Sequence, residues 1–297
     1  MIPMRGGTKW RALLIALAVV PPVLAQSPSV SPVELIRSTV RNETNPENSE
    51  AKYMFRDRKE VSHNSQTKLM IETRDAMAGI LVAINDKPLS AQQRMEENAR
   101  VERFASDPSE LKKKQRQERE ETERVERIMK ALPEAFTYEY AGTEPSSPGI
   151  GKPGRVLTRV KFVPNPSYSP PTHVEQVLTG MAGYMLIDTK DHRIAKIDGT
   201  LQSEVSFGWG ILGHLDRGGH FLVQQAVAGD ENWEISRMDL AFTGKILLFK
   251  SINFTQTETM DDFRPVPSNL TFAQGLELLR KHEALLAENG PRPSAEK

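Results

Sequence analysis

Apolar and polar residues alternate, or apolar residues run together, in three short stretches before residue 85 of this 297-residue chain. The stretches lie at Tyr53–Val61, Thr67–Thr73 and Gly79–Ile84. Such patterns are typical of β-strands, and the turn-forming segments His63-Asn64-Ser65 and Asp75-Ala76-Met77 separate them. The pattern predicts an antiparallel meander of three strands.

A second and longer set of strands is predicted after residue 155. Hairpin-length turn signals at 189–192, 228–232 and 243–244 favour antiparallel neighbours. Three early strands are too few for a stable sheet of their own, so we expect all strands to form one large sheet that must curl or close. The predicted later strands are Val156–Val163, Gly183–Asp188, Arg193–Phe207, Gly219–Val227, Trp233–Thr243 and Lys245–Glu258.

Capping residues predict helices before and between the two sets of strands. The motif Ser31-Pro32-Val33-Glu34 begins a helix that runs to about Asn42. Ser90 with Gln93 begins another, which lasts to Ser106. Strands and separate helices together predict the α+β fold class, with helices covering a curved antiparallel sheet.

Two further helices follow from the same capping chemistry. Asp107-Pro108-Ser109-Glu110 begins a helix that continues to about Leu132. Thr271 with Gln274 begins the last helix. The apolar residues of this last helix are Leu276, Leu278, Leu279 and Leu285.

The helix that begins at Asp107 is strongly charged. Acidic and basic residues stand four positions apart along it, as in Arg116–Glu120 and Glu126–Lys130. Such a helix is either a binding arm or a solvated excursion. Balanced charge runs are usually solvated helix faces, so we favour the second and expect these charges to form no site. We expect docking only at the C-terminal end, through Val125, Ile128, Met129 and Leu132.

Three strands carry consecutive apolar residues, at Tyr184–Ile187, Phe221–Val223 and Ile246–Phe249. A strand with one wet face should alternate, so both faces of the sheet are expected to be covered there. The cover on one side is either packed side chains or a cavity for an apolar ligand. The sequence leaves both alternatives open.

The chain begins with an export signal. Arg5, Lys9 and Arg11 precede the apolar run Ala12–Val20, and small residues end at Ala25. We therefore predict a signal peptide at 1–25, a periplasmic or secreted mature protein and no later membrane span. The mature chain is expected to form one curved-sheet domain at 26–290, with the charged helical pair 90–132 inserted and a polar tail at 291–297.

Composition removes several classes of function. The 39 basic and 39 acidic residues cancel, so no field of the whole protein favours nucleic acid, and no nucleic-acid partner is expected. The chain has no cysteine, which excludes disulfides, thiolate metal sites and a lipid-modified cysteine anchor.

No catalytic, cofactor or metal site is predicted. His214, Asp216 and His220 lack an evident ligand spacing, because Gly218-Gly219 intervenes. Nucleophile elbows and phosphate loops are absent from the sequence. Glu258 and Asp261-Asp262 are interpreted as solvated or salt-bridged acids, and we expect a protein that is not an enzyme.

The order of elements is similar to that of a known family. The segment Gly183–Asp188 is followed by Arg193–Ile197, and a later strand ends in Thr257-Glu258. In these features the chain resembles the periplasmic lipoprotein-carrier (outer-membrane lipoprotein sorting) superfamily over about residues 31–270. The pattern is also similar to that of uncharacterised exported bacterial proteins with the signatures that stand here as Phe207-Gly208 and Asp262-Phe263-Arg264. The resemblance implies a half-barrel whose concave face, lidded by helices, holds acyl chains.

The functional expectation is a binding or carrier protein for an apolar ligand such as a lipid or a lipoprotein acyl chain. The alternative is an envelope interaction or sensing module with a packed core, which would use the charged helix pair or a sheet edge to hold a protein partner. Wide apolar walls would be needed for an acyl chain. The candidate ligand-binding rings are Trp209, Phe221, Trp233, Phe249 and Phe254.

Overall fold

Thirteen strands and four α-helices make up the parts of the chain that the computed structural model describes, which are residues 30–45, 51–208, 212–229, 232–246 and 250–289. The predicted signal peptide and the tail at 291–297 lie outside the described residues. The account below concerns the compact unit that begins at Pro32. No helix of the described part is long and apolar enough to cross a membrane.

The first strands are close to those predicted. They are β1 (Lys52–Val61), β2 (Asn64–Ile71), β3 (Ala78–Ile84) and the short β4 (Lys87–Pro88). The later strands are β5 (Phe136–Pro145), β6 (Val156–Pro164), β7 (Met181–Asp188), β8 (Arg193–Leu201), β9 (Val205–Phe207), β10 (Gly213–Leu215), β11 (His220–Ala228), β12 (Asn232–Ile246) and β13 (Lys250–Val266).

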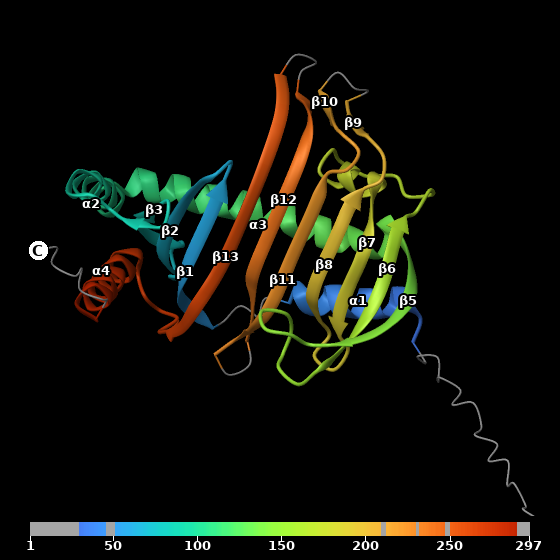
Figure 1. Cartoon of the computed structure of the whole chain (residues 1–297), viewed down its shortest axis with the longest axis horizontal. Coiled ribbons are helices and arrows are strands. Elements are labelled where there is room, and N and C mark those ends of the chain that lie inside the picture. Colours follow the sequence, from blue (N-terminus) through green and yellow to red (C-terminus); the bar gives the residue numbers. More distant parts are fainter. Residues whose placement is uncertain (1–29, 46–50, 209–211, 230–231, 247–249, 290–297) are drawn as a thin grey trace, which may run out of the picture. The chain divides into compact units, whose positions relative to one another are not determined.

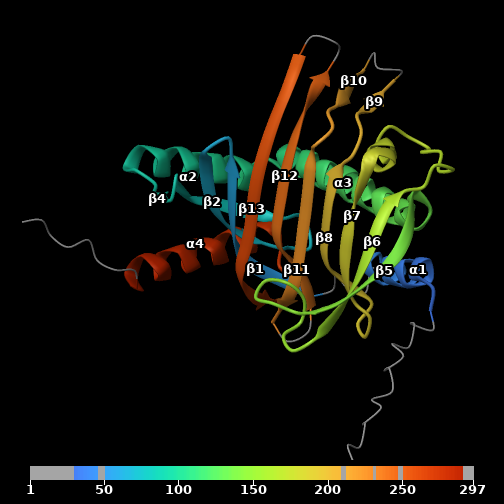
Figure 2. The same ribbon diagram turned by 45° about the vertical axis from the view of Figure 1, so that its right-hand side comes forward.

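All named strands belong to one antiparallel sheet with the order β4-β3-β2-β1-β13-β12-β11-β8-β7-β6-β5, and β10 pairs with both β9 and β12. The early meander joins the later strands through β1 and β13, which pair from Lys52↔Val266 to Val61↔Gln256. The early strands therefore do complete their sheet with later ones, as expected. β4 and β5 are the two ends of this order, so the sheet is open and curved, not a closed barrel (Figures 1 and 2).

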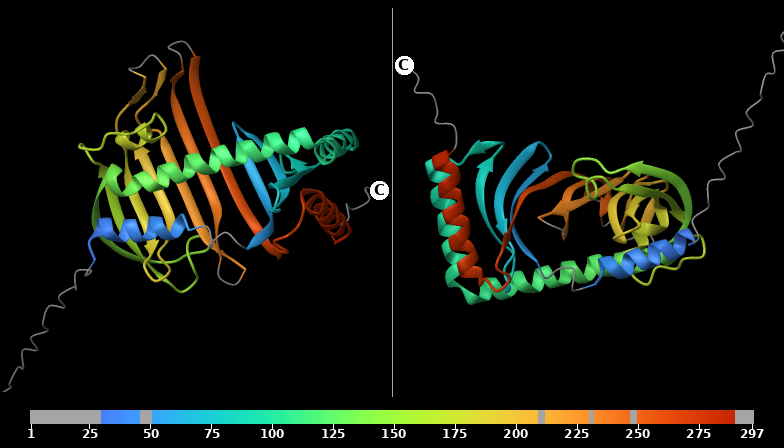
Figure 3. Two further views of the ribbon diagram at one scale, coloured as in Figure 1. Left: turned by 180° about the vertical axis from the view of Figure 1, so that it is seen from behind. Right: turned by 90° about the horizontal axis from the view of Figure 1, so that it is seen from below.

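The helices begin where the capping residues predict. They are α1 (Pro32–Glu43), α2 (Ala91–Ser106), α3 (Pro108–Ala135) and α4 (Phe272–Asn289), and a 3₁₀-helix, η2, spans Glu175–Gly180. The side chain of Ser90 accepts from the Gln93 backbone in a complete capping box, and Asp107 caps α3 by accepting from Ser109 N. Figure 3 shows α1 and α3 crossing one face of the curved sheet, with α2 and α4 side by side beyond β1–β3. The predicted α+β class and helical cover are confirmed.

Two apolar clusters lie on the side of the sheet that the helices cover. The first cluster joins α1 and the C-terminal end of α3 to β5, β6 and β7, with Phe162 and Met185 among its fully buried members. The second cluster joins β1, β2 and β3 to α2 and α4, with Ile71 and Leu279 at its centre. A smaller third cluster holds Leu186, which lies between Met185 and Ile187 in the sequence but packs apart from them. Both faces of β7 are therefore covered, as the consecutive apolar residues predict.

Three sequence predictions about strands were wrong. β5 was missed, because its exposed polar residues and following Gly-Ser-Pro segment are typical of a loop. The expected strand Arg193–Phe207 is two strands, β8 and β9. The expected turn at Thr243-Gly244 is part of β12. Gly244 instead allows the backbones of β12 and β10 to approach closely, since a Cβ there would collide with the carbonyl oxygen of His214 on β10.

Two expectations about helix faces also need correction. Leu285 was placed on the apolar face of the last helix but is 55% exposed. Val125 was expected to be one of the residues through which α3 docks, but it is 62% exposed. The other expected docking residues do pack, since Ile128 and Met129 contact the first cluster and Leu132 is buried in it. Leu111, near the N-terminal end of α3 where no docking was expected, packs against the second cluster. The helix α3 therefore docks at both ends.

Candidate functional site

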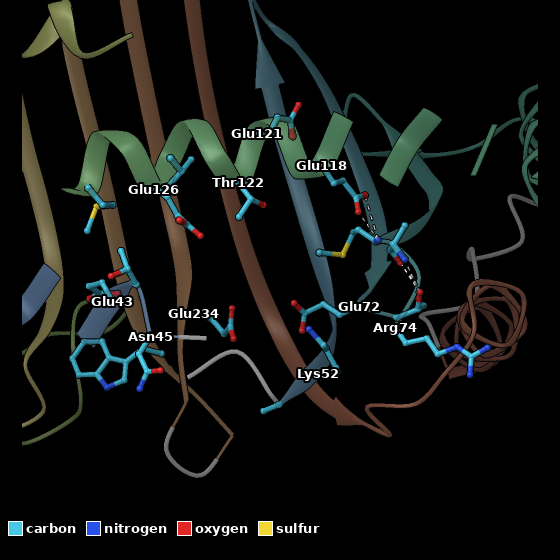
Figure 4. Close-up of a pocket in the computed structure, with 18 of the residues that line it drawn as sticks. Glu43, Asn45, Lys52, Glu72, Arg74, Glu118, Glu121, Thr122, Glu126 and Glu234 are labelled. Carbon is cyan, nitrogen blue, oxygen red and sulfur yellow. Dashed lines mark hydrogen bonds between the residues drawn. The ribbon is translucent and has the colours of Figure 1, made fainter. Parts of the chain in front are cut away.

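A cavity of about 980 Å³ separates the middle of α3 from the sheet (Figure 4). We call it the α3 cavity. Its lining combines α3 with the end of α1, the start of β1, the residues that follow β2 and the starts of β8 and β12. The charged residues of the lining are Glu43, Lys52, Glu72, Arg74, Asp75, Lys114, Glu118, Glu121, Glu126, Arg193 and Glu234.

The composition of α3 explains why the space beneath it is not filled. Residues 112–124 of the helix are all polar or charged, so this stretch offers no apolar stripe to the sheet. A helix of this length spans roughly 40 Å at 1.5 Å per residue, enough to connect two separate docking points. Its packing partners are α1, β5 and η2 towards one end and α2 at the other. The middle of α3 thus bridges the two apolar clusters without packing on the strands between them.

Polar contacts fix the N-terminal part of α3 beside the loop between β2 and β3. Gln115 donates its Nε2 to the Asp75 carbonyl oxygen at 3.0 Å. The Glu118 carboxylate accepts from Met77 N, at 3.2 Å through its Oε2, and pairs with Lys114. These bonds satisfy loop backbone groups, so they position one wall of the cavity.

Two carboxylates, Glu72 and Glu234, face the centre of the cavity (Figure 4). The Glu72 side chain, just after β2, accepts from Tyr53 N at 2.8 Å, and burial raises its pKa. Burial also raises the pKa of Glu234, to about 7, and the negative charge of Glu72 adds to the rise. The positive charges of Arg193 and Lys52 oppose that rise without cancelling it. Ionised carboxylates in this part of the cavity are therefore less well solvated than they would be in water.

A buried ion pair forms the end wall near α1. Glu43, the last residue of α1, lies 3.1 Å from Arg193 Nη2, and both side chains are largely buried. The Glu43 carboxylate also accepts from Ile194 N at 2.7 Å, yet burial still raises its pKa. The Arg193 guanidinium lies 5.9 Å from the ring centre of Trp233. Because Arg193 is engaged by Glu43 and Gln225, it offsets only part of the negative charge in the middle of the cavity.

The lining as a whole is acidic and mixed in polarity. Seven acidic residues face four basic ones, and α3 adds the exposed Val125 and the half-buried Met129. Thr122 and Glu126 project from α3 towards the sheet (Figure 4). A cationic, partly apolar occupant complements such walls, whereas an acyl chain requires predominantly apolar ones.

Comparison with known proteins gives only a weak structural likeness. No protein-family model matches the chain. A search of curated proteins also finds no match. Among solved structures, MucB in complex with MucA(peri) has 7% identity and a TM-score of 0.21, over 79% of this chain and 99% of that one. The Pseudomonas aeruginosa MucA/MucB complex has 8% identity and a TM-score of 0.22, over 83% and 96%. Scores this low do not establish a shared fold or function.

Of the predicted ligand-binding rings, the three that the structure describes do not gather around the cavity. Trp209 and Phe249 lie outside the described residues. Phe221 packs against the first cluster, and Phe254 stands opposite Phe242 across β12 and β13. Trp233 alone among the described members of the set lines the α3 cavity, and it is 8% exposed within the third cluster. A ligand site made by all five rings remains a prediction.

The acids near the end of β13 are paired with basic residues. Asp261 forms a two-pronged pair with Arg56, at 2.7 and 2.8 Å, and Asp262 pairs with Arg264 at 3.1 Å. Glu258 lies 3.4 Å from Lys59. The salt-bridged interpretation of these acids is confirmed.

Sequence reasoning missed the acids of the α3 cavity. The run of charge on α3 was visible, and a binding arm was one interpretation of it, but balanced charge favoured a solvated face. The useful signal was the gap between Leu111 and Val125, which shows that a long helix has apolar residues only near its ends. That Glu72 and Glu234 lie opposite this gap follows from the sheet order β2-β1-β13-β12, which leaves only β1 and β13 between β2 and β12.

Proposed function

We propose that this protein is an exported, non-enzymatic binding module that holds a positively charged segment of a protein partner in the α3 cavity. The observation that carries the proposal is the excess of acids over bases in the walls, seven to four, around a cavity of about 980 Å³. Charge complementarity of this kind steers a basic partner and fixes its register. The proposal favours the interaction module over the acyl-chain carrier.

The shape of the site suits an extended chain segment more than a small molecule. The cavity runs beneath the polar middle of α3, from Glu43 near α1 to Asp75 near the N-terminal part of that helix. Val125, Met129 and Met77 provide apolar contacts along this path. A segment in which basic and apolar side chains alternate would meet both kinds of wall.

Binding of a synthetic peptide tests the proposal. The full mature chain is titrated with a short peptide in which arginine alternates with leucine, and with a matched peptide in which glutamate replaces arginine. We expect saturable binding of the basic peptide only. The double variant Glu72→Gln/Glu234→Gln should weaken it at least about tenfold, or about 1.4 kcal/mol. Glu139→Gln removes an exposed acid of β5 outside the cavity and should leave affinity unchanged.

The carrier hypothesis makes the opposite prediction in the same experiment. A fluorescent fatty acid is titrated into the same proteins, and native mass spectrometry records any lipid retained through purification. Under our proposal the fatty acid does not compete with the basic peptide. Saturable fatty-acid binding together with no binding of the basic peptide would overturn the proposal in favour of the acyl-chain carrier.

A further inference from the structure

Three potential metal ligands meet at the β9–β10 hairpin, away from the α3 cavity. They are Glu204, His214 and Asp216, and their ligand atoms all lie within 4.8 Å of one another. His214 Nε2 is 3.3 Å from Asp216 Oδ1. None of these three residues lines the cavity described above.

The strand register explains why these residues converge. His214 pairs with Ser206, and Leu215 pairs with Val205, in the antiparallel β9–β10 hairpin. Continuing that register by one position places Asp216 opposite Glu204. Residues two apart share a face of a strand, so His214 lies on the same side as Asp216. Two carboxylates and an imidazole are thus brought to one face of a short hairpin.

The two carboxylates of this group face each other across the hairpin as like charges. Like charges directly opposite each other across two strands are destabilising. In the described part of the chain, Glu204 accepts a hydrogen bond from Ser206 Oγ at 3.0 Å, and Asp216 pairs with His214. Neither carboxylate has a lysine or arginine partner among the described residues. A bound cation would relieve the repulsion.

His220 also lies beside a carboxylate, but that carboxylate has a lysine partner as well. His220 Nε2 lies 3.0 Å from Asp198 Oδ1, while Lys196 Nζ lies 3.0 Å from Asp198 Oδ2. Asp198 therefore already has a cationic partner. From the sequence, His220 was considered as a ligand with His214 and Asp216, and that set was rejected. In the structure Glu204, not His220, lies beside His214 and Asp216.

We propose that Glu204, His214 and Asp216 bind a divalent first-row transition-metal ion such as Zn²⁺. Zinc takes imidazole and carboxylate ligands at about 2.0–2.1 Å, so neighbouring ligands of a tetrahedral site are about 3.3 Å apart. The separation of His214 Nε2 and Asp216 Oδ1 equals that value. Water would complete the fourth position. Ca²⁺ requires six to eight oxygen ligands, so three side chains that include an imidazole select against it.

The backbone that carries the ligands is held on both sides. β10 pairs with β9 and with β12, and Asp216 N donates to the Thr243 carbonyl oxygen at 2.9 Å. Gly244 allows that close approach, because a side chain there would collide with His214 O. Two of the three ligands therefore project from, or directly follow, a strand paired on both edges. This fixed backbone limits the rearrangement needed on binding.

Isothermal titration of the full mature chain with Zn²⁺ tests this site. The protein is prepared without a histidine tag and stripped with chelator, and Ca²⁺ and Mg²⁺ are titrated as controls. We expect one Zn²⁺ per chain and a higher midpoint of thermal unfolding with Zn²⁺. Mutating an outer-shell partner of a metal ligand typically weakens binding about 10–100-fold. His214→Ala removes a ligand itself, so it should weaken Zn²⁺ binding by more than that. His220→Ala is the matched control and should bind as the unmodified protein does.

Asp216→Asn and Glu204→Gln guard against a folding artefact, because they keep the shape of each side chain. We expect both variants to retain the circular dichroism spectrum and to lose most of the Zn²⁺ affinity. Three results would overturn the site: no Zn²⁺ binding by the unmodified chain, affinity unchanged in Asp216→Asn and Glu204→Gln, or equal losses in His214→Ala and His220→Ala.

Discussion

The two ends of α3 are anchored by different physical means. At the C-terminal end, Ile128 and Met129 pack against the first cluster and Leu132 is buried within it. At the N-terminal end, Leu111 is the apolar contact with the second cluster, and Gln115 and Glu118 bind loop backbone groups. Apolar burial therefore dominates one attachment and hydrogen bonding contributes heavily to the other. The stretch between them contacts neither cluster, and that is where the acidic cavity lies.

The two clusters also differ in how the chain assembles them. The first cluster uses neighbouring strands β5–β7 and includes the Phe136–Phe162 ring pair, whose centroids are 4.7 Å apart. The second joins the early strands to α4 near the end of the chain, a wider separation in sequence than that between α1 and β5–β7 in the first. A binding site between the clusters depends on both, because each one holds one end of the bridging helix. The following predictions test this division.

The largest effect is expected in the first cluster. Phe162 is 2% exposed and packs against Phe136, so Phe162→Ala should lower the free energy of unfolding by about 3–5 kcal/mol. Val163→Ala, at the exposed next position of β6, is the matched control and should change it by less than about 0.5 kcal/mol. Denaturant unfolding followed by circular dichroism measures both. Equal losses of unfolding free energy in the two variants would show that the first cluster is not the core of the β5–β7 end of the sheet.

A slightly smaller effect is expected in the second cluster. Leu279 is fully buried, so Leu279→Ala should cost about 2–5 kcal/mol, while Leu285→Ala on the exposed face of α4 should be nearly neutral. Tryptophan fluorescence and circular dichroism are followed in the same denaturant series. If the two clusters unfold as one cooperative unit, both signals shift together. Separate transitions in Leu279→Ala would show instead that the second cluster unfolds independently.

Sequence reasoning predicted this framework better than it predicted the candidate site. Ser90 with Gln93 and Thr271 with Gln274 marked helix starts because capping is local chemistry. Gly244 was misread because a glycine in a turn and a glycine beside a crossing backbone have the same local pattern. The placement of Glu234 near Glu72 depends on the pairing of β1 with β13, which is a long-range property that no local pattern contains.

The cavity between the clusters should give stability an unusual pH dependence. Burial raises the pKa of Glu234 from 4.5 to about 7, so the folded protein binds an extra proton in that interval. The stabilising contribution of this group is complete below about pH 4.5 and is lost as the pH rises through 7. Glu234→Gln mimics the protonated carboxyl. Near pH 4.5 the variant should equal the unmodified protein, and at pH 8 it should be more stable by about 1–3 kcal/mol.

Urea unfolding at several pH values between these limits measures the difference. Lys52, Arg193 and Glu72 also face Glu234, so the comparison uses a single substitution that leaves all three in place. Glu139→Gln on β5 is the control and should show no such trend. A difference that stays constant across this pH range would contradict a desolvated carboxylate in the cavity. The same titration predicts that affinity for the basic peptide rises as Glu234 ionises.

The smallest effect on stability is expected at the unpacked middle of α3. Val125 is 62% exposed and lines the cavity without joining either cluster, so Val125→Ala should change the free energy of unfolding by less than about 0.5 kcal/mol. Leu132→Ala, two turns further along, removes a side chain buried in the first cluster and should cost about 2–5 kcal/mol. If Val125 is an apolar contact for a bound segment, Val125→Ala should still weaken the basic peptide measurably. A large loss of stability in Val125→Ala would mean that the middle of α3 packs on the sheet, and the cavity would then not be open to a partner.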